Sequence, residues 1–284
     1  MGSIQVSHLG WRLPGGVELL RDVSFSVGDG DRAALVGANG VGKSTLMRLI
    51  AGDLTATSGT LSIDGRLGVM RQLVGAADDT EGAPTTVREL LVSLAPPPVR
   101  SAAVRLAVAE EQAGVDPMRY ATALADWGDH GGYDAEVLWD ECISRAVGLG
   151  LTEVADRPLR TFSGGEQKRM ALEVLLRGDD DILLLDEPDN FLDVPAKRWL
   201  ERELATTRKT VLYVSHDREL LAATATRIIT IEAEGAWTHG GGFAGYAEAR
   251  QAHLDKLSKD RLRSSSYHER SLLSFSRWPW RASA

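Results

Sequence analysis

The N-terminal part of the chain is patterned as short strands around one helix. Residues 23–27, Val-Ser-Phe-Ser-Val, alternate apolar and polar side chains, which predicts a strand with one buried face. The run 33–36 is wholly apolar and ends at Gly37, which is typical of a strand buried on both faces. Helical spacing follows over 44–50, and 59–69 predicts two strands separated at Asp64-Gly65.

The middle of the chain, roughly 73–160, has a helical pattern instead. Helical spacing is clear over 87–91 and 102–112, and the prolines at 96–98 separate the two segments. This segment is rich in alanine and carries 7 Arg and no Lys against 15 Asp and Glu, a net charge of −8. We therefore predict a layer of helices with a solvated acidic surface.

After residue 161 strand and helix patterns alternate. Strands are predicted at 181–185, 210–214 and 227–232, and helices at 199–206 and 218–225. This alternation predicts a largely parallel sheet.

Composition excludes several classes of protein. The 284 residues are 43% hydrophobic and 25% charged, which is ordinary for a globular chain of about two domains. A single cysteine, Cys142, excludes a disulfide framework. No run of about 18 apolar residues is present, so nothing is expected to span a bilayer, and residues 1–5 do not resemble a secretory signal. The net charge of −8 argues against nucleic-acid binding through overall positive charge.

One segment has the full pattern of a phosphate-binding loop, between a predicted strand and a predicted helix. It consists of Gly37, Ala38, Asn39, Gly40, Val41, Gly42, Lys43 and Ser44. The glycines let backbone N–H groups converge on phosphate oxygens, and the helix N-terminus adds partial positive charge. Lys43 is expected to reach the β- and γ-phosphates, and Ser44 to ligate Mg²⁺.

Further polar clusters follow predicted strands or open a predicted helix. Asp186 ends an apolar strand, where its carboxylate can face Mg²⁺, and Glu187 can orient or deprotonate an attacking water. Ser163, Gly164 and Gly165 open a helix and form a second anion cradle. His216 follows another apolar strand and can donate to a γ-phosphate.

In this order the motifs resemble the nucleotide-binding domain of an ATP-binding-cassette (ABC) protein. The loop from Gly37 resembles Walker A, and Ser163 to Gln167 resembles the LSGGQ signature, with Phe162 in place of Leu. The remaining matches are Gln72 (Q-loop), Asp186 and Glu187 (Walker B), Phe191-Leu192-Asp193 (D-loop) and His216 (switch histidine). The resemblance covers about 4–235. It implies an α/β fold: a P-loop NTPase core with a mostly parallel sheet, an antiparallel β subdomain and an inserted α-helical subdomain.

The segment from Asp186 to Asp193 resembles DEPTNHLD, the form typical of the ABC-F branch. It keeps Asn190 but has Asp189 in place of Thr and Phe191 in place of His. The segments 127–136, 148–151 and 241–246, the last followed by Arg250, also resemble ABC-F sequences. Such proteins are soluble and cytoplasmic, carry two cassettes in one chain and act on the ribosome, in some cases giving antibiotic resistance. The alternative is the cytosolic ATP-binding subunit of an ABC transporter, which pairs with a membrane-domain subunit.

The resemblance assigns roles to particular residues. It implies ATP hydrolysis with Glu187, His216 and Lys43 as catalytic residues and Mg²⁺ bound by Ser44, Gln72 and Asp186. It implies ATP contacts from the Walker A residues 37–44, Thr45, Gln72, Asp186, Ser163, Gly164, Gly165 and Glu166. Trp11 is a candidate for stacking on adenine, and a loop from Trp11 to Asp22 is expected beside it; a Trp in a core or loop explains Trp11 equally well.

The resemblance also implies a composite site, because ATP lies between Walker A of one cassette and the signature of another. The sequence holds one copy of each motif, so we expect it to need a second cassette, either its own copy or another half. Otherwise it would act as a nucleotide-gated binding module with little turnover. We predict one cassette over 1–245, with the helical subdomain inserted at about 73–178, and a linker-like tail over 246–284.

The tail is basic, with 8 Lys and Arg against 4 Asp and Glu, which leaves a net charge of −12 on the rest. A basic segment suits a phosphate backbone, and ABC-F linkers contact transfer RNA on the ribosome. Its helical pattern runs from Tyr246 to about Leu262 and then gives way to a Ser-rich end. A disordered terminus, a diverged linker and an out-of-frame end are the three explanations.

Overall fold

The computed structural model describes residues 2–71, 85–232 and 235–259. Within these residues the strands form two sheets. The first is antiparallel, in the order β2-β1-β4, and consists of β1 (Ser3–Arg12), β2 (Glu18–Val27) and β4 (Ser58–Asp64).

The second sheet has six strands in the order β5-β6-β7-β3-β8-β9. Five of them are parallel to their neighbours, and only β9 runs antiparallel. The strands are β5 (Leu67–Met70), β6 (Ile182–Asp186), β7 (Thr210–Val214), β3 (Arg32–Val36), β8 (Arg227–Glu232) and β9 (Gly235–His239).

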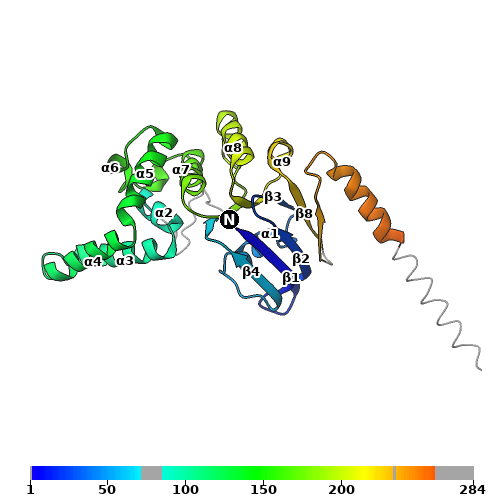
Figure 1. The fold of residues 1–284 in the computed structure, drawn as a ribbon, viewed down its shortest axis with the longest axis horizontal. Coiled ribbons are helices and arrows are strands. Elements are labelled where there is room, and N and C mark those ends of the chain that lie inside the picture. The colour runs from blue at the N-terminus through cyan, green and yellow to red at the C-terminus, as the bar shows by residue number, and fades with distance from the viewer. Residues whose placement is uncertain (1, 72–84, 233–234, 260–284) are drawn as a thin grey trace, which may run out of the picture.

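Helices cover the second sheet and extend away from it on one side (Figure 1). Close to the sheet are α1 (Lys43–Ile50), α7 (Gly164–Arg177), α8 (Val194–Thr206) and α9 (Arg218–Thr224). The outlying group is α2 (Val87–Leu94), α3 (Pro97–Glu111), α4 (Pro117–Asp129), α5 (Gly132–Val147) and the short α6 (Leu151–Val154). A last helix over 246–259 lies on the opposite side of the sheets from this group (Figure 1).

The parallel sheet is buried on both faces, which explains its continuous apolar runs. On β6, Leu183 and Leu185 face a core shared with the helices, whereas Ile182 and Leu184 face a second core. That second core lies between the two sheets and includes α1. Side chains of a strand point alternately to its two faces, so each central strand contributes to both cores.

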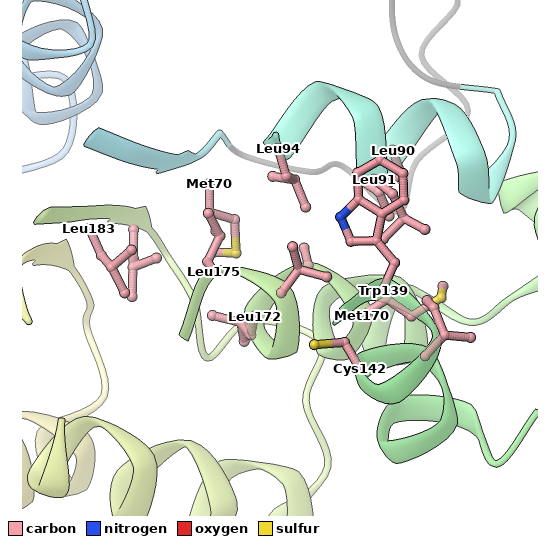
Figure 2. Close-up of a cluster of buried hydrophobic side chains, with 14 of the residues drawn as sticks. Met70, Leu90, Leu91, Leu94, Trp139, Cys142, Met170, Leu172, Leu175 and Leu183 are labelled. Carbon is pink, nitrogen blue, oxygen red and sulfur yellow. The ribbon is translucent and has the colours of Figure 1, made fainter. Parts of the chain in front are cut away.

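Helix α7 joins the sheet to the outlying helices. Its Met170, Leu172 and Leu175 are buried in the first core (Figure 2). The same cluster takes Met70 and Leu183 from the sheet, Leu90, Leu91 and Leu94 from α2, and Trp139 and Cys142 from α5. The helix that begins at the signature residues is therefore packed rigidly between the sheet and the helical layer.

The fold class predicted from the sequence is confirmed: a mostly parallel sheet, an antiparallel sheet and an inserted group of helices. The expectation of a loop from Trp11 to Asp22 was wrong. The strands β1 and β2 continue into this segment and pair Trp11 with Leu20, which leaves only residues 13–17 as the connection. The pairing was missed because shifts of register between β1 and β2 interrupt the alternation along β1.

Two further elements differ from the sequence patterns. Helix α8 begins at Val194 rather than Trp199, because Asp193 caps it and Pro195 occupies its first turn. Strand β9 was not predicted. The tail is helical over 246–259, and the explanations offered for its end concern residues outside the described ranges.

Candidate functional site

The phosphate-binding loop connects β3 to α1, with residues 38–40 exposed at its tip. Gly37, Gly40 and Gly42 have φ of +157°, +78° and +106°, values that side-chain-bearing residues rarely adopt. A Cβ on Gly37 would lie 2.7 Å from the carbonyl oxygen of Ile231, and one on Gly42 would lie 2.8 Å from Cδ2 of Leu20. The two outer glycines are therefore required both by backbone conformation and by close packing.

Lys43 is the first residue of α1 and is only 8% exposed. Its Nζ donates hydrogen bonds to the carbonyl oxygens of Gly37 and Ala38, at 3.0 and 3.1 Å. Burial lowers the pKa of Lys43, and the negative charges of Glu187 and Asp186 act in the opposite direction. The ammonium group is thus held against the loop and close to the two acidic residues.

Asp186 ends β6 and is 7% exposed. Burial raises the pKa of its carboxyl group, and a hydrogen bond from the Ser44 side chain lowers it. Ser44 therefore lies beside Asp186, although the two residues are on elements far apart in sequence. A hydroxyl and a carboxylate oxygen fit Mg²⁺, which takes oxygen ligands and completes its shell with phosphates and water.

Glu187 follows β6 in a left-handed conformation, with φ of +50°. Its N–H donates to the carbonyl oxygen of Val214 at 3.0 Å, which fixes it to the end of β7. Its half-buried carboxylate accepts a hydrogen bond from Nδ2 of Asn190, and its backbone carbonyl accepts one from Nζ of Lys168. This geometry places a carboxylate next to the Ser44 and Asp186 pair.

His216 is exposed at the end of β7, on the same edge of the sheet. The residues on either side of it are held firmly. The Ser215 hydroxyl is buried and accepts from the N–H of Asp217 at 2.9 Å. Asp217 caps α9 and forms an ion pair with Lys197 at 2.8 Å, so the pKa of Asp217 is held below its usual value.

Ser163 is the exposed N-cap of α7. Its hydroxyl accepts from the N–H of Glu166 at 3.2 Å, while the Glu166 carboxylate accepts from the Ser163 N–H at 2.7 Å. Among the residues that the structure describes, no hydrogen bond or ion pair joins this signature segment to the phosphate-binding loop. The structure thus brings together Lys43, Ser44, Asp186 and Glu187, and it leaves Ser163 on an open surface.

A family profile described as ABC transporter matches residues 20–190 of the chain. The chain belongs to the ATP-binding-cassette family. Membership of this ABC family implies binding and hydrolysis of ATP.

Curated relatives of this ABC domain support the resemblance to the ABC-F branch. An "Antibiotic resistance protein" of Mycobacteroides abscessus is 46% identical over 272 residues, covering 93% of this chain and 49% of that protein. The "Tylosin resistance ATP-binding protein TlrC" of Streptomyces fradiae is 35% identical, covering 82% and 43%. The mouse "ATP-binding cassette sub-family F member 3" is 34% identical, covering 83% and 32%. The chain spans about half or less of the length of these relatives.

A solved structure supports the fold alone. It belongs to a metal-chelate type ABC transporter in an inward-facing conformation, and it matches with a TM-score of 0.57 at 17% identity. The match covers 85% of this chain and 84% of that one. In the described part of the present ABC domain, no helix is long and apolar enough to cross a membrane.

The roles of two further residues that were predicted at the ABC site stay predictions. Trp11 lies on β1, half-buried against the core between the two sheets. Its role at adenine stays a prediction. Gln72 lies outside the described residues, so its place at the metal is likewise a prediction.

Sequence reasoning missed Lys168, a buried cation that contacts the backbone of Glu187. The helical pattern of α7 contained a signal that this lysine is buried. Lys168 shares a helix face with Ala171, Leu172 and Leu175, at the i+3, i+4 and i+7 positions, all of which are buried. A charged residue on an otherwise apolar face indicates a buried partner.

Proposed function

We propose that this chain binds MgATP where the phosphate-binding loop meets the end of β6, and hydrolyses it in a site completed by a second cassette. One observation carries the proposal. A buried lysine, a hydroxyl and two carboxylates from separate elements converge at the carboxyl edge of the parallel sheet. In doubly wound α/β folds this edge is where nucleotides bind.

Each residue has a role that its position supports. Lys43 pairs with the β- and γ-phosphates in place of its own loop carbonyls, and the loop N–H groups bind phosphate oxygens. Ser44 and Asp186 hold Mg²⁺, which neutralises charge on the phosphates when bound. Glu187 orients the attacking water and accepts its proton, and His216 donates to the γ-phosphate.

The position of Ser163 supports a site shared between cassettes. Ser163 is exposed at the start of α7, and its hydroxyl is hydrogen-bonded to Glu166 rather than to any described group of the phosphate-binding loop in the same chain. This chain spans half or less of each of these relatives, so the rest of each relative is long enough to hold a second cassette. We propose that the signature of one cassette completes the ATP site of the other.

The test compares Glu187→Gln with a control, Glu111→Gln, at an exposed position on α3. We expect Glu187→Gln to bind MgATP with nearly unchanged affinity and to lose turnover by about 10²–10⁴-fold, the usual contribution of a general base. The control should keep wild-type turnover. Unchanged turnover in Glu187→Gln would remove the general-base role.

The dependence of the ATPase rate on protein concentration tests whether a second cassette is needed for hydrolysis. A steady-state ATPase rate per chain that rises with concentration is expected if two copies pair to form the site. A flat, negligible rate without added partner, together with retained ATP binding, is the result expected of a nucleotide-gated binding module.

We further propose that the ABC domain acts on the ribosome and its transfer RNA in the cytoplasm, where it works as a translation or antibiotic-resistance factor. The support is the resemblance to ABC-F sequences and the resistance functions named for two relatives. Glu187→Gln with ATP should co-sediment with 70S ribosomes, and the wild type should not remain bound after turnover. ATP turnover without ribosome binding would favour the transporter-subunit alternative.

A further inference from the structure

Lys168 lies one turn into α7, directly below the signature residues, and is 1% exposed. A lysine in such a place is costly because burial removes its hydration. Burial accordingly lowers the pKa of Lys168, and the negative charges of Asp189, Glu187 and Asp186, in that order, raise it. The lysine is thus retained against a desolvation cost, which requires specific partners.

The first partner is a backbone atom. Nζ of Lys168 donates a hydrogen bond to the carbonyl oxygen of Glu187, the residue that we propose as general base. The same ammonium lies 5.7 Å from the centroid of the Phe191 ring. Lys168 therefore contacts both ends of the segment 187–191, which is part of the connection 187–193 between β6 and α8.

The second partner is a charge. Asp189 is 5% exposed, and its Oδ1 is buried with no hydrogen-bond partner among the described residues. This carboxylate stands where the DEPTNHLD pattern has Thr. A buried carboxylate needs positive charge nearby. Asp189 acts electrostatically on both Lys168 and Lys197, and Lys197 is also paired with Asp217. Asp189 is also the acidic group with the largest effect on the pKa of Lys168.

The segment 187–191 needs to be held from outside. Glu187 and Phe191 have φ of +50° and +67°, and residues other than glycine keep such conformations only when their surroundings impose them. The signature helix supplies a second constraint, since a Cβ on Gly165 would lie 2.8 Å from the carbonyl oxygen of Phe191. The start of α7 thus touches this segment at both of its strained positions.

We propose that Lys168 is a positioning residue for Glu187: it holds the Glu187 carbonyl in place, and the buried charge of Asp189 keeps the lysine there. The pair couples the signature helix to the loop of the proposed general base within one cassette. Its meaning for catalysis rests on the proposed ATPase function, whereas its effect on the conformation of 187–193 does not.

The test uses Lys168→Met, Lys168→Gln, Asp189→Thr and the double variant Lys168→Gln/Asp189→Thr. Lys209→Met is the matched control. Lys209 is half-buried, whereas Lys168 is fully buried, but it likewise donates to backbone carbonyls, those of Leu175, Gly178 and Asp180. It precedes β7 and contacts the C-terminal end of α7, away from the signature residues. Two quantities are measured: amide exchange of 187–193 without nucleotide, and kcat and KM for ATP.

We expect Lys168→Met to raise exchange in 187–193 by about tenfold and to lower kcat by about 10–100-fold, with KM for ATP within about twofold of wild type. Lys168→Gln should be impaired as well, because it removes one of the two lysine charges that act on the buried Asp189 carboxylate. The double variant should recover most of the kcat and of the exchange protection that the single variants lose. Such non-additivity is expected of a coupled pair. The control should change neither quantity.

Two results would overturn the inference. One is a Lys168→Met variant that behaves like Lys209→Met in both measurements. The other is a double variant whose defects are the sum of the single ones, which remains informative even if Lys168→Met fails to fold. If wild type hydrolyses no ATP while the exchange pattern is as expected, the proposed function fails and the positioning of 187–193 stands.

Discussion

The two glycines Gly40 and Gly42 of the phosphate-binding loop give a matched test of the geometry, because only one of them is closely packed. An added Cβ at Gly40, with φ of +78°, would have nothing within 4 Å. An added Cβ at Gly42, with φ of +106°, would lie 2.8 Å from Cδ2 and 3.3 Å from Cγ of Leu20, and 3.3 Å from Cγ of Leu19. Leu20 is 1% exposed and belongs to the core that includes α1.

The expected losses of unfolding free energy follow from this difference. Gly40→Ala carries only the strain of a left-handed conformation, about 1–2 kcal/mol, partly offset by the lower entropy of the unfolded chain, which leaves about 1 kcal/mol. Gly42→Ala carries a comparable strain and in addition the overpacking of Leu20, about 1–3 kcal/mol. We therefore expect a total of about 2–4 kcal/mol for Gly42→Ala.

The assay is thermal unfolding followed by circular dichroism, without nucleotide, for wild type and both variants. At about 2–4 °C per kcal/mol for a chain of this size, Gly42→Ala should melt about 2–12 °C below Gly40→Ala. Equal melting temperatures for the two variants would refute the inferred contact between the loop and β2. The rise in Tm on adding MgATP then reports how much binding each loop retains.

Three further outcomes are expected. Ser163→Arg should bind ATP with nearly wild-type affinity but not hydrolyse it, because the serine acts on the partner's nucleotide; a large loss of binding would contradict this. Asp217→Asn should lower the free energy of unfolding by about 1 kcal/mol at neutral pH, because the ion pair with Lys197 lowers the pKa of Asp217 in the folded state. In urea unfolding at a series of pH values, the difference from wild type should shrink below pH 3.8 as Asp217 becomes protonated. Burial raises the pKa of Cys142 to about 12, so iodoacetamide should label it only after unfolding.

Much of the site could be predicted because its parts are local. The run from Gly37 to Ser44 carries its own structural requirements: glycines where φ is positive, and a lysine at the start of a helix. Asp186 and Glu187 are marked by the apolar strand before them. The role of Ser163 as a helix cap is likewise visible in the capping box that it forms with Glu166.

Other features were not predictable from local pattern. Shifts of register between β1 and β2 interrupt the alternation along β1, so the pairing of Trp11 with Leu20 left no clear period in the sequence. Asp189 was noticed as a departure from the DEPTNHLD pattern, but nothing near it in the sequence indicated a partner. Lys168 is on another element, and only the packing of α7 against the end of β6 brings it to the Glu187 carbonyl.

The sequence by itself determined the order of strands and helices, the phosphate-binding loop and the identity of the acidic residues, since burial periodicity and backbone conformation depend on neighbours along the chain. Only the tertiary structure decided which of these residues meet. The strand order β6-β7-β3 places Asp186 beside Ser44, and the packing of α7 places Lys168 beneath Glu187. Such contacts depend on which strands pair and which faces pack, and these are set by the burial of the whole core rather than by any single segment.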